Sequence, residues 1–358
     1  MHIFANPTAS ILYRPGAAWT ALGEYKSYDG PWALHEGLEH VSLWTKYLMP
    51  TDFGDVALTL SAYEGDWHPT EQIPERAIGT AACPDAFCAL DTSAGGNTSR
   101  WIAGAQLNGA DWTGSAYLQT YDWNMQSDPT YDFQINQFDQ RVTAGGRLDK
   151  TLFETMRFDL RVGGELRYDD IDSVGLDENV DGLYVANISH NAIEETSLGV
   201  YAESTWYATD RLRVMGGLRT DYYDFDVTAL SPGSFAGSET DTLTSPKLGL
   251  AYALNEQVEL YGNWGRGFHS NDARGVVNQL DPLVGLSPGT GYETGARLEV
   301  NELILTAAYW WLDVDSELIF VGDSNSVEPR GASSAGFRVR TRTPISCSPP
   351  SCSPAASS

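Results

Sequence analysis

The sequence predicts an all-β protein, an antiparallel up-and-down β-barrel that spans a membrane. Three observations support this fold class: apolar and charged residues alternate with a period of two, short and long connections alternate, and aromatic residues cluster near strand ends. The sequence has no run of 18 or more apolar residues, which excludes a membrane-spanning helix. A barrel strand needs only about 9–11 residues with every second one apolar.

The alternation is clearest in residues 156–168. The odd positions include Arg157, Arg161 and Glu165, whereas the even positions include Phe158 and Leu166. One face is therefore charged and the other apolar along a segment longer than the roughly 5–6 residues of an average soluble strand.

The same pattern, more or less clean, predicts about fourteen strands. They cover 8–13, 17–27, 38–49, 56–64, 99–108, 112–123, 138–148, 156–168, 198–206, 212–222, 243–254, 258–266, 292–300 and 303–311.

The predicted connections differ in length from one end of the strands to the other. Short turns alternate with long polar loops, which we expect at 28–37, 67–98, 124–136, 169–195, 225–242 and 269–290. A barrel with tight periplasmic turns and large outer loops has this arrangement, whereas a sandwich or propeller has no reason for it. Tryptophans and tyrosines near strand ends fit interfacial girdles.

The charge of the chain limits its partners. The formal net charge is −26, with 22 Lys and Arg against 48 Asp and Glu. Phosphate binding needs clustered basic residues, so nucleic acid is not expected as a partner. The acidity fits either a soluble surface or a polar lumen with acidic loops.

Two close cysteine pairs occur, Cys83/Cys88 and Cys347/Cys352. Cys83 and Cys88 lie in a loop-like stretch, where they form either a small disulfide or free thiols. A metal site would need more ligands, and His68 is the nearest histidine, so no metal and no cofactor are expected.

Two segments partly match known catalytic or metal-binding motifs, but each lacks a feature that the motif requires. Residues 285–289 fit G-x-S-x-G, but Pro288 follows the serine and has no N–H for an oxyanion hole. Asp177, Asn179 and Asp181 begin like an EF-hand loop, but its twelfth position is Ile188 instead of Glu. We therefore predict neither catalytic residues nor enzyme activity.

The densest polar cluster is the segment 264–275, where a strand is expected to enter an outer loop. His269, Asn271, Asp272 and Arg274 are candidate ligand-binding residues there. The alternative is that these side chains bond the loop to the wall and shape the mouth of the barrel.

Several segments, in order along the chain, resemble the barrel of TonB-dependent outer-membrane receptors. They are YDGPW (28–32), TEQIPERAI (70–78), YDDI (168–171), YAES (201–204), LTSPKLGLAYALNEQVELYGNWGRGFHSNDARG (243–275), GYETGARL (291–298) and DSELIFVGD (315–323). The resemblance covers roughly residues 17–330. It implies a 22-stranded barrel closed by a plug, located in the outer membrane of a Gram-negative bacterium.

The resemblance also implies a function and partners. Such receptors import ferric siderophores or similar scarce nutrients, and the TonB complex drives transport through the plug. The expected partners are the outer membrane, TonB and a small metal chelate. The charges expected to face the lumen, and in an intact relative the plug, are Arg141, Arg147, Arg157, Arg161, Glu165, Arg213 and Arg219.

The chain departs from the family pattern in three ways. From the sequence we expect no signal peptide, no plug, and about fourteen strands of a 22-stranded barrel. We therefore expect residues 1–330 to form a partial barrel with the shape of an open, curved sheet. After Gly331 the family-like pattern gives way to a Ser/Pro-rich sequence, so residues 331–358 are predicted to be a disordered tail, and a frameshift near residue 332 is a hypothesis.

Three rival functions remain. A passive porin-like channel would lack the plug, and a barrel enzyme would need a Ser/His/Asp or Asp/His cluster, which we do not find. A soluble all-β binding protein would be recovered without detergent.

Overall fold

The computed structural model describes residues 3–5, 8–14, 16–128, 133–301, 303–321 and 326–342. Almost all of this part belongs to one antiparallel sheet of sixteen strands. The strands are β1 (Ile3–Ala5), β2 (Thr8–Arg14), β3 (Ala17–Tyr28), β4 (Leu38–Thr51), β5 (Gly54–Trp67), β6 (Gly95–Asn108), β7 (Trp112–Ser127), β8 (Gln134–Glu154), β9 (Phe158–Val180), β10 (Leu183–Tyr207), β11 (Leu212–Ala229), β12 (Gly237–Ala253), β13 (Val258–Ser270), β14 (Leu286–Val300), β15 (Leu303–Val321) and β16 (Ser326–Arg342). Two short helices, η1 (Glu75–Ala77) and α1 (Ala273–Val276), lie in connections.

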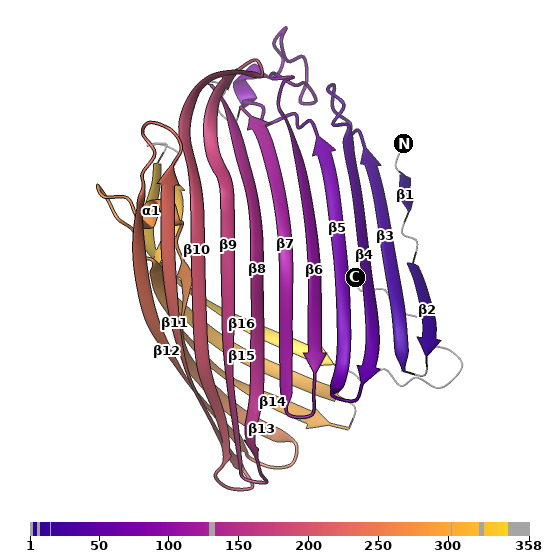
Figure 1. Ribbon diagram of the computed structural model, residues 1–358, viewed down its shortest axis with the longest axis vertical. Coiled ribbons are helices and arrows are strands. Elements are labelled where there is room, and N and C mark those ends of the chain that lie inside the picture. The colour runs from indigo at the N-terminus through magenta and orange to yellow at the C-terminus, as the bar shows by residue number, and fades with distance from the viewer. Residues whose placement is uncertain are drawn as a thin grey trace.

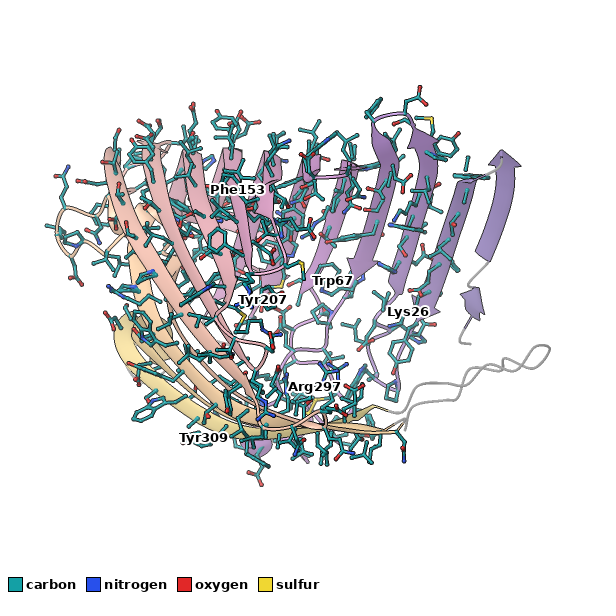
Figure 2. All side chains as sticks on the ribbon, turned by 90° about the horizontal axis from the view of Figure 1, so that it is seen from below. Lys26, Trp67, Phe153, Tyr207, Arg297 and Tyr309 are labelled. Atoms are coloured by element: carbon teal, nitrogen blue, oxygen red, sulfur yellow. A yellow bond between two sulfur atoms is a disulfide. The ribbon has the colours of Figure 1, made fainter. Side chains whose placement is uncertain are left out.

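The strands follow one another around the sheet in chain order. From β3 to β16 each strand pairs with the next, while β1 and β2 both pair with β3. Figure 1 shows this meander, and Figure 2 shows that the sheet curls into an open trough. Within the described residues no register joins β16 to β1 or β2. The predicted fold class, an antiparallel up-and-down sheet of the barrel type, is therefore confirmed.

All fourteen predicted strands occur, as β2 to β15, and the sequence analysis missed β1 and β16. β16 pairs with β15 as far as Arg342, so the expectation of a disordered tail from residue 331 differs from the structure over 331–342. Phe337 and Val339 alternate with Arg338 and Arg340 there, a pattern that the many serines obscure. Residues 343–358, which include Cys347 and Cys352, lie outside the described residues.

Three predicted loops are largely strand in the structure. The stretch 169–195 is a hairpin of β9 and β10 that turns at Asp181 and Gly182, both with positive φ (49° and 79°). Most of the described residues in 124–136, and most of 225–242, are likewise strand. These extensions carry polar residues on both faces, so the alternation that reveals a strand is lost while its hydrogen-bond ladder continues.

The two faces of the sheet differ in chemistry. The outer face carries Leu148, Leu166, Leu198 and Leu218, which are between 47% and 58% exposed. The inner face carries the opposite positions, mainly charged residues, tyrosines and glycines. In Figure 2, Arg297 lies within the curve and Tyr309 lies outside it. A broad exposed apolar band opposite a polar inner face fits contact with lipid on the outside.

No helix in the described part of the chain is long and apolar enough to cross a membrane.

The pairing between β12 and β13 is incomplete. It covers only Lys247–Ala253 of β12, although β12 begins at Gly237. The residue next to Lys247 is Pro246, which has no N–H to donate, so the ladder between these strands ends there.

Above this point the segment from β13 through α1 to β14 packs on the inner side of β9 to β11. Ala273, Val276 and Val277 form a buried apolar cluster with Phe225 and Val227 of β11, together with Ile171 and Ile193. The ring of Phe268 also lies 5.9 Å from that of Tyr223. The mouth of the trough is therefore narrowed by a packed segment.

Candidate functional site

The inner face of β8 to β12 holds a dense set of ionic contacts, which we call the inner-wall charge cluster. The strand register places its members on one face: Arg147 pairs opposite Glu165, and Tyr201 pairs opposite both Gly163 and Arg219. The cluster consists of Arg147, Asp149, Arg161, Glu165, Tyr201, Glu203, Arg219, Asp221 and Lys247.

In this cluster, side chains from strands two apart in the sheet contact each other, because the strand between them has a glycine at that position. The Tyr201 hydroxyl on β10 donates to Asp149 on β8, and Gly163 of β9 lies between them. A Cβ at Gly163 would lie 2.3 Å from the Tyr201 hydroxyl. Strands two apart in a sheet are separated by about 10 Å, and such contacts need a bare backbone in between and a concave face on which side chains converge.

The same arrangement occurs twice more. Gly217 of β11 lies between Lys247 of β12 and Glu203 of β10, which form an ion pair. Gly199 of β10 lies below Arg219, and a Cβ there would lie 2.3 Å from Nη2 of that arginine. These glycines allow long polar side chains to lie flat along the wall.

Asp149 is the most heavily bonded carboxylate of the cluster. Its Oδ2 accepts from Nε of Arg147 at 2.9 Å, and its Oδ1 lies 3.0 Å from Nη2 of Arg161. Its side chain is only 6% exposed. A buried carboxylate is stable there because two guanidinium groups and a hydroxyl replace its water.

Arg219 of β11 is the most heavily bonded cation of the cluster. Its Nη2 lies 2.6 Å from Oδ1 of Asp221, and its Nη1 lies 3.2 Å from Oε2 of Glu165 on β9. The guanidinium carbon also lies 5.7 Å from the ring centre of Tyr201, close enough for a cation–π contact. Arg219 therefore joins β9, β10 and β11.

The structure brings four of the seven predicted wall residues together: Arg147, Arg161, Glu165 and Arg219. Arg141 pairs instead with Asp139 on its own strand, and Arg213 lies 3.3 Å from Glu259 of β13. Arg157 precedes β9 and lies in the turn after β8, where its carbonyl accepts from Tyr207 N–H.

Sequence reasoning missed the partners of these cations. The missed residues are Asp139, Asp149, Tyr201, Glu203, Asp221, Lys247 and Glu259. One signal was available, because Arg147 and Asp149, and likewise Arg219 and Asp221, stand two apart on one strand face. Contacts between second-neighbour strands depend on the register and have no such signal.

The four candidate residues at the mouth have different environments. Asn271 is buried, and its amide donates to the Val284 carbonyl at 2.8 Å. Asp272 caps α1 by accepting from the Arg274 N–H, and it forms a two-pronged ion pair with the Arg274 guanidinium at 2.6 and 2.9 Å. These three residues therefore bond the loop to itself.

His269 has a different position, near the upper end of β13. It is exposed and lines a recess of about 420 Å³ together with Phe268, Ser287 and Val314. Among the four candidates, its side chain is the one best placed to meet a ligand.

The ion pair at the mouth shifts the pKa of Asp272. Partial burial raises this pKa, but the hydrogen bonds and positive charge of Arg274 outweigh burial and hold the pKa of Asp272 below its ordinary value. The same contacts raise the pKa of Arg274. The pair is therefore ionised at neutral pH.

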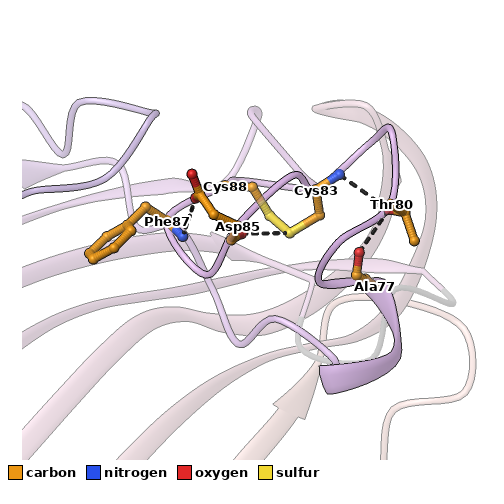
Figure 3. Close-up of a disulfide and its surroundings, with 6 residues drawn as sticks. All are labelled: Ala77, Thr80, Cys83, Asp85, Phe87 and Cys88. Atoms are coloured by element: carbon orange, nitrogen blue, oxygen red, sulfur yellow. Dashed lines mark hydrogen bonds between the residues drawn. A yellow bond between two sulfur atoms is a disulfide. The ribbon is translucent and has the colours of Figure 1, made fainter.

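A disulfide joins Cys83 and Cys88 in the connection between β5 and β6, with a Cα–Cα distance of 5.2 Å (Figure 3). Phe87 lies within this small loop. Its carbonyl accepts from Ala33 N–H at 2.7 Å, and its ring lies 5.6 Å from that of Trp32. The connection between β5 and β6 thus packs on the one between β3 and β4.

A network of amides holds the other end of the same connection. Gln134 of β8 donates to Asp91, and Gln126 of β7 donates to the Ser93 carbonyl at 3.1 Å. Burial raises the pKa of Asp91, but hydrogen bonds from Ser93, Gln134 and the Ala94 backbone more than offset it, so this pKa is lowered. The loop is therefore anchored at both of its ends.

No group of three or more His, Cys, Asp or Glu side chains suited to a metal ion occurs among the described residues. In the segment that begins like an EF-hand loop, Asp177 accepts from the Asn187 amide at 2.6 Å.

These features define a class of protein. A long-stranded meander with an apolar outer face, a charged inner face, short turns at one end and packed connections at the other is the wall of an outer-membrane β-barrel.

Residues 18–343 match the family model described as TonB dependent receptor-like, beta-barrel, and the chain belongs to this family. Receptors of this family are located in the outer membrane of Gram-negative bacteria. No curated protein sequence matches the chain.

Solved structures show the same fold. The chain is similar to the ferric yersiniabactin uptake receptor FyuA from Yersinia pestis, with a TM-score of 0.72 and 14% identity, over 95% of this chain and 56% of that one. It is also similar to the ferric citrate transporter FecA (TM-score 0.73, 12% identity, 95% and 52% covered) and to the copper transporter OprC (0.72, 15%, 96% and 56%). The chain spans about half the length of these structures. Neither the family nor these neighbours support the passive-channel alternative.

Proposed function

We propose that this chain forms part of the wall of an outer-membrane receptor that imports a scarce metal chelate, such as a ferric siderophore, with energy from the TonB complex. One observation carries the proposal: the barrel of a TonB-dependent receptor matches almost the whole described chain. Its structural neighbours include a ferric yersiniabactin uptake receptor, a ferric citrate transporter and a copper transporter. The chain itself is assigned no enzymatic role.

The geometry supports a division of labour between mouth and wall. His269 and the recess beside it meet the ligand at the mouth, while Asn271, Asp272 and Arg274 hold the loop in place. The inner-wall charge cluster faces the lumen, where a plug domain through which TonB acts would contact Arg147, Arg161, Glu165 and Arg219. Charged, well-hydrated contacts suit a plug that must move during transport.

Uptake of iron-55 tests this function. The protein is expressed in cells that lack their own ferric-chelate receptors, in two strains that differ only in TonB. We expect uptake of at least one chelate in the TonB-containing strain and loss of that uptake in the other strain. Equal uptake of the chelate in both strains would contradict the proposal and support a passive channel.

A further inference from the structure

A recess of about 370 Å³ opens in the inner wall beside the charge cluster. It lies at the level at which β12 and β13 separate, and residues of β8 and β10 to β13 line it. Its lining includes Arg147, Tyr201, Arg219, Ser245, Lys247 and Phe268.

Cationic side chains outnumber carboxylates in the lining of the recess, although the chain as a whole is strongly acidic. Four cations line it, Arg147, Arg219, Lys247 and Arg266, against the single carboxylate of Glu203. The other carboxylates that pair with these cations, such as Asp149 and Asp221, do not belong to the lining. Arginine and lysine keep further N–H groups for a second acceptor when one carboxylate is already bound.

A second observation points to a ligand. The Ser245 side chain lines the same recess, the residue is only 8% exposed, and its Oγ is buried without a hydrogen-bond partner in the described structure. A buried hydroxyl without a partner costs free energy, so such a group marks a place where a missing atom completes the bonding. Ser245 pairs opposite Arg219 on the neighbouring strand, and both residues line the recess.

We propose that this recess is a binding subsite for an oxyanion, a carboxylate or a phosphate group, that accepts hydrogen bonds from Ser245, Lys247 and the two arginines. Phe268 and Tyr201 provide apolar surface beside the charged groups and limit water around the bound oxygen atoms. The carboxylate can belong to a small solute in the lumen or to an acidic side chain of another segment of the receptor.

Isothermal titration calorimetry on the full 358-residue chain in detergent micelles tests the subsite. The probes are citrate and inorganic phosphate as free solutes, and N-acetyl-glutamate amide as the mimic of an acidic side chain. We expect at least one probe to bind, and binding to weaken as salt is added. Tighter binding of citrate or phosphate indicates a solute, and tighter binding of the glutamate derivative indicates a side chain.

Two variants and a control test whether the probe binds in this recess. Ser245→Ala removes one hydroxyl and should weaken binding about tenfold, as should Lys247→Gln. Lys46→Gln changes a lysine of β4 outside the recess and should bind like the parent chain. The proposal is overturned if no probe binds, if both recess variants bind like the parent chain, or if the Lys46 variant loses as much affinity as they do. Because binding is measured at equilibrium without TonB, failure of transport and failure of this subsite are distinguishable.

Discussion

The hydroxyl of Tyr201 on β10 donates a hydrogen bond to the carboxylate of Asp149 on β8, across the glycine of the strand between them. Asp149 also binds the guanidinium groups of Arg147 and Arg161. Three adjacent strands are therefore joined by side chains as well as by their backbone ladder. The contact depends on Gly163, because any side chain there would occupy the path of the tyrosine ring.

Replacement of Gly163 by alanine should therefore displace Tyr201. The added Cβ would lie 2.3 Å from the tyrosine hydroxyl, and we expect a loss of about 1–3 kcal/mol in the free energy of unfolding. Urea unfolding of the chain in lipid vesicles measures this loss. Gly164→Ala is the matched control, because its Cβ would have only an ordinary contact of 3.6 Å to the Gly199 carbonyl. Equal effects of the two substitutions would contradict the account.

The pH dependence of the mouth should depend on Asp272. Its pKa in the folded state lies below the ordinary value, so its contribution to stability is complete above about pH 4, the unfolded value, and is lost as the pH falls through the folded pKa. Hydrogen exchange of the Val276 and Val277 amides, both bonded within α1, reports this contribution.

Asp272→Asn is the appropriate comparison, because asparagine also caps a helix but does not titrate. The ratio of protection between the parent chain and the variant should be highest above about pH 5 and should fall toward pH 2. A ratio that stays constant over this range would show that the ion pair with Arg274 contributes nothing.

The disulfide should stabilise its loop and not the sheet. Closing six residues restricts the unfolded loop by about 2 kcal/mol, so Cys83→Ser with Cys88→Ser should make the connection between β5 and β6 about tenfold more sensitive to protease. The temperature at which the sheet unfolds on a gel should not change. A large decrease in that temperature would mean that the loop is part of the cooperative unit of the barrel.

Substitutions at two residues of the mouth should distinguish ligand binding from structural stability. Asn271→Ala removes a buried amide that bonds to Val284, and it should lower the free energy of unfolding by about 1–3 kcal/mol. His269→Ala removes an exposed side chain and should leave stability within about 0.5 kcal/mol while it weakens binding of the chelate. Chelate titration and urea unfolding of both variants check this contrast. If His269→Ala binds normally, the ligand contacts other residues.

The sequence was sufficient to predict the strands that cross the membrane, because there one face is apolar and the other polar. In β9, Phe158 to Tyr168 shows this contrast except at Gly163 and Gly164. The part beyond Asp169 carries polar residues on both faces, with apolar residues such as Ile171 among them, so no regular alternation predicts a strand there. A β-bulge adds to the difficulty. Arg141 of β8 pairs with Ile171 and Gln140 pairs with Ser173, so Asp172 is an extra residue on β9. Beyond this bulge the odd and even positions of β9 exchange faces.

The sequence predicts some residues of the inner-wall charge cluster but not their partners. Arg147 and Arg219 stand on the charged face by alternation alone, but Tyr201 and Lys247 reach partners two strands away. Such partners follow from the stagger of the strands and from the positions of glycines, and no local pattern encodes either of these. Asn271 was a candidate ligand contact by composition, although its burial depends on how the loop folds back.

The placement of the two faces of β9 is the central claim, and single cysteines along 160–167 test it most directly. They are introduced into a Cys347→Ser, Cys352→Ser background, labelled with a fluorophore and placed in bilayers that contain brominated lipid. We expect quenching at positions 160, 162, 164 and 166, and no quenching but reaction with water-soluble thiol reagents at 161, 165 and 167. Position 163 is left as glycine because a side chain there would displace Tyr201. Absence of quenching at every position would contradict a membrane-spanning wall, and quenching at every position would contradict a polar lumen.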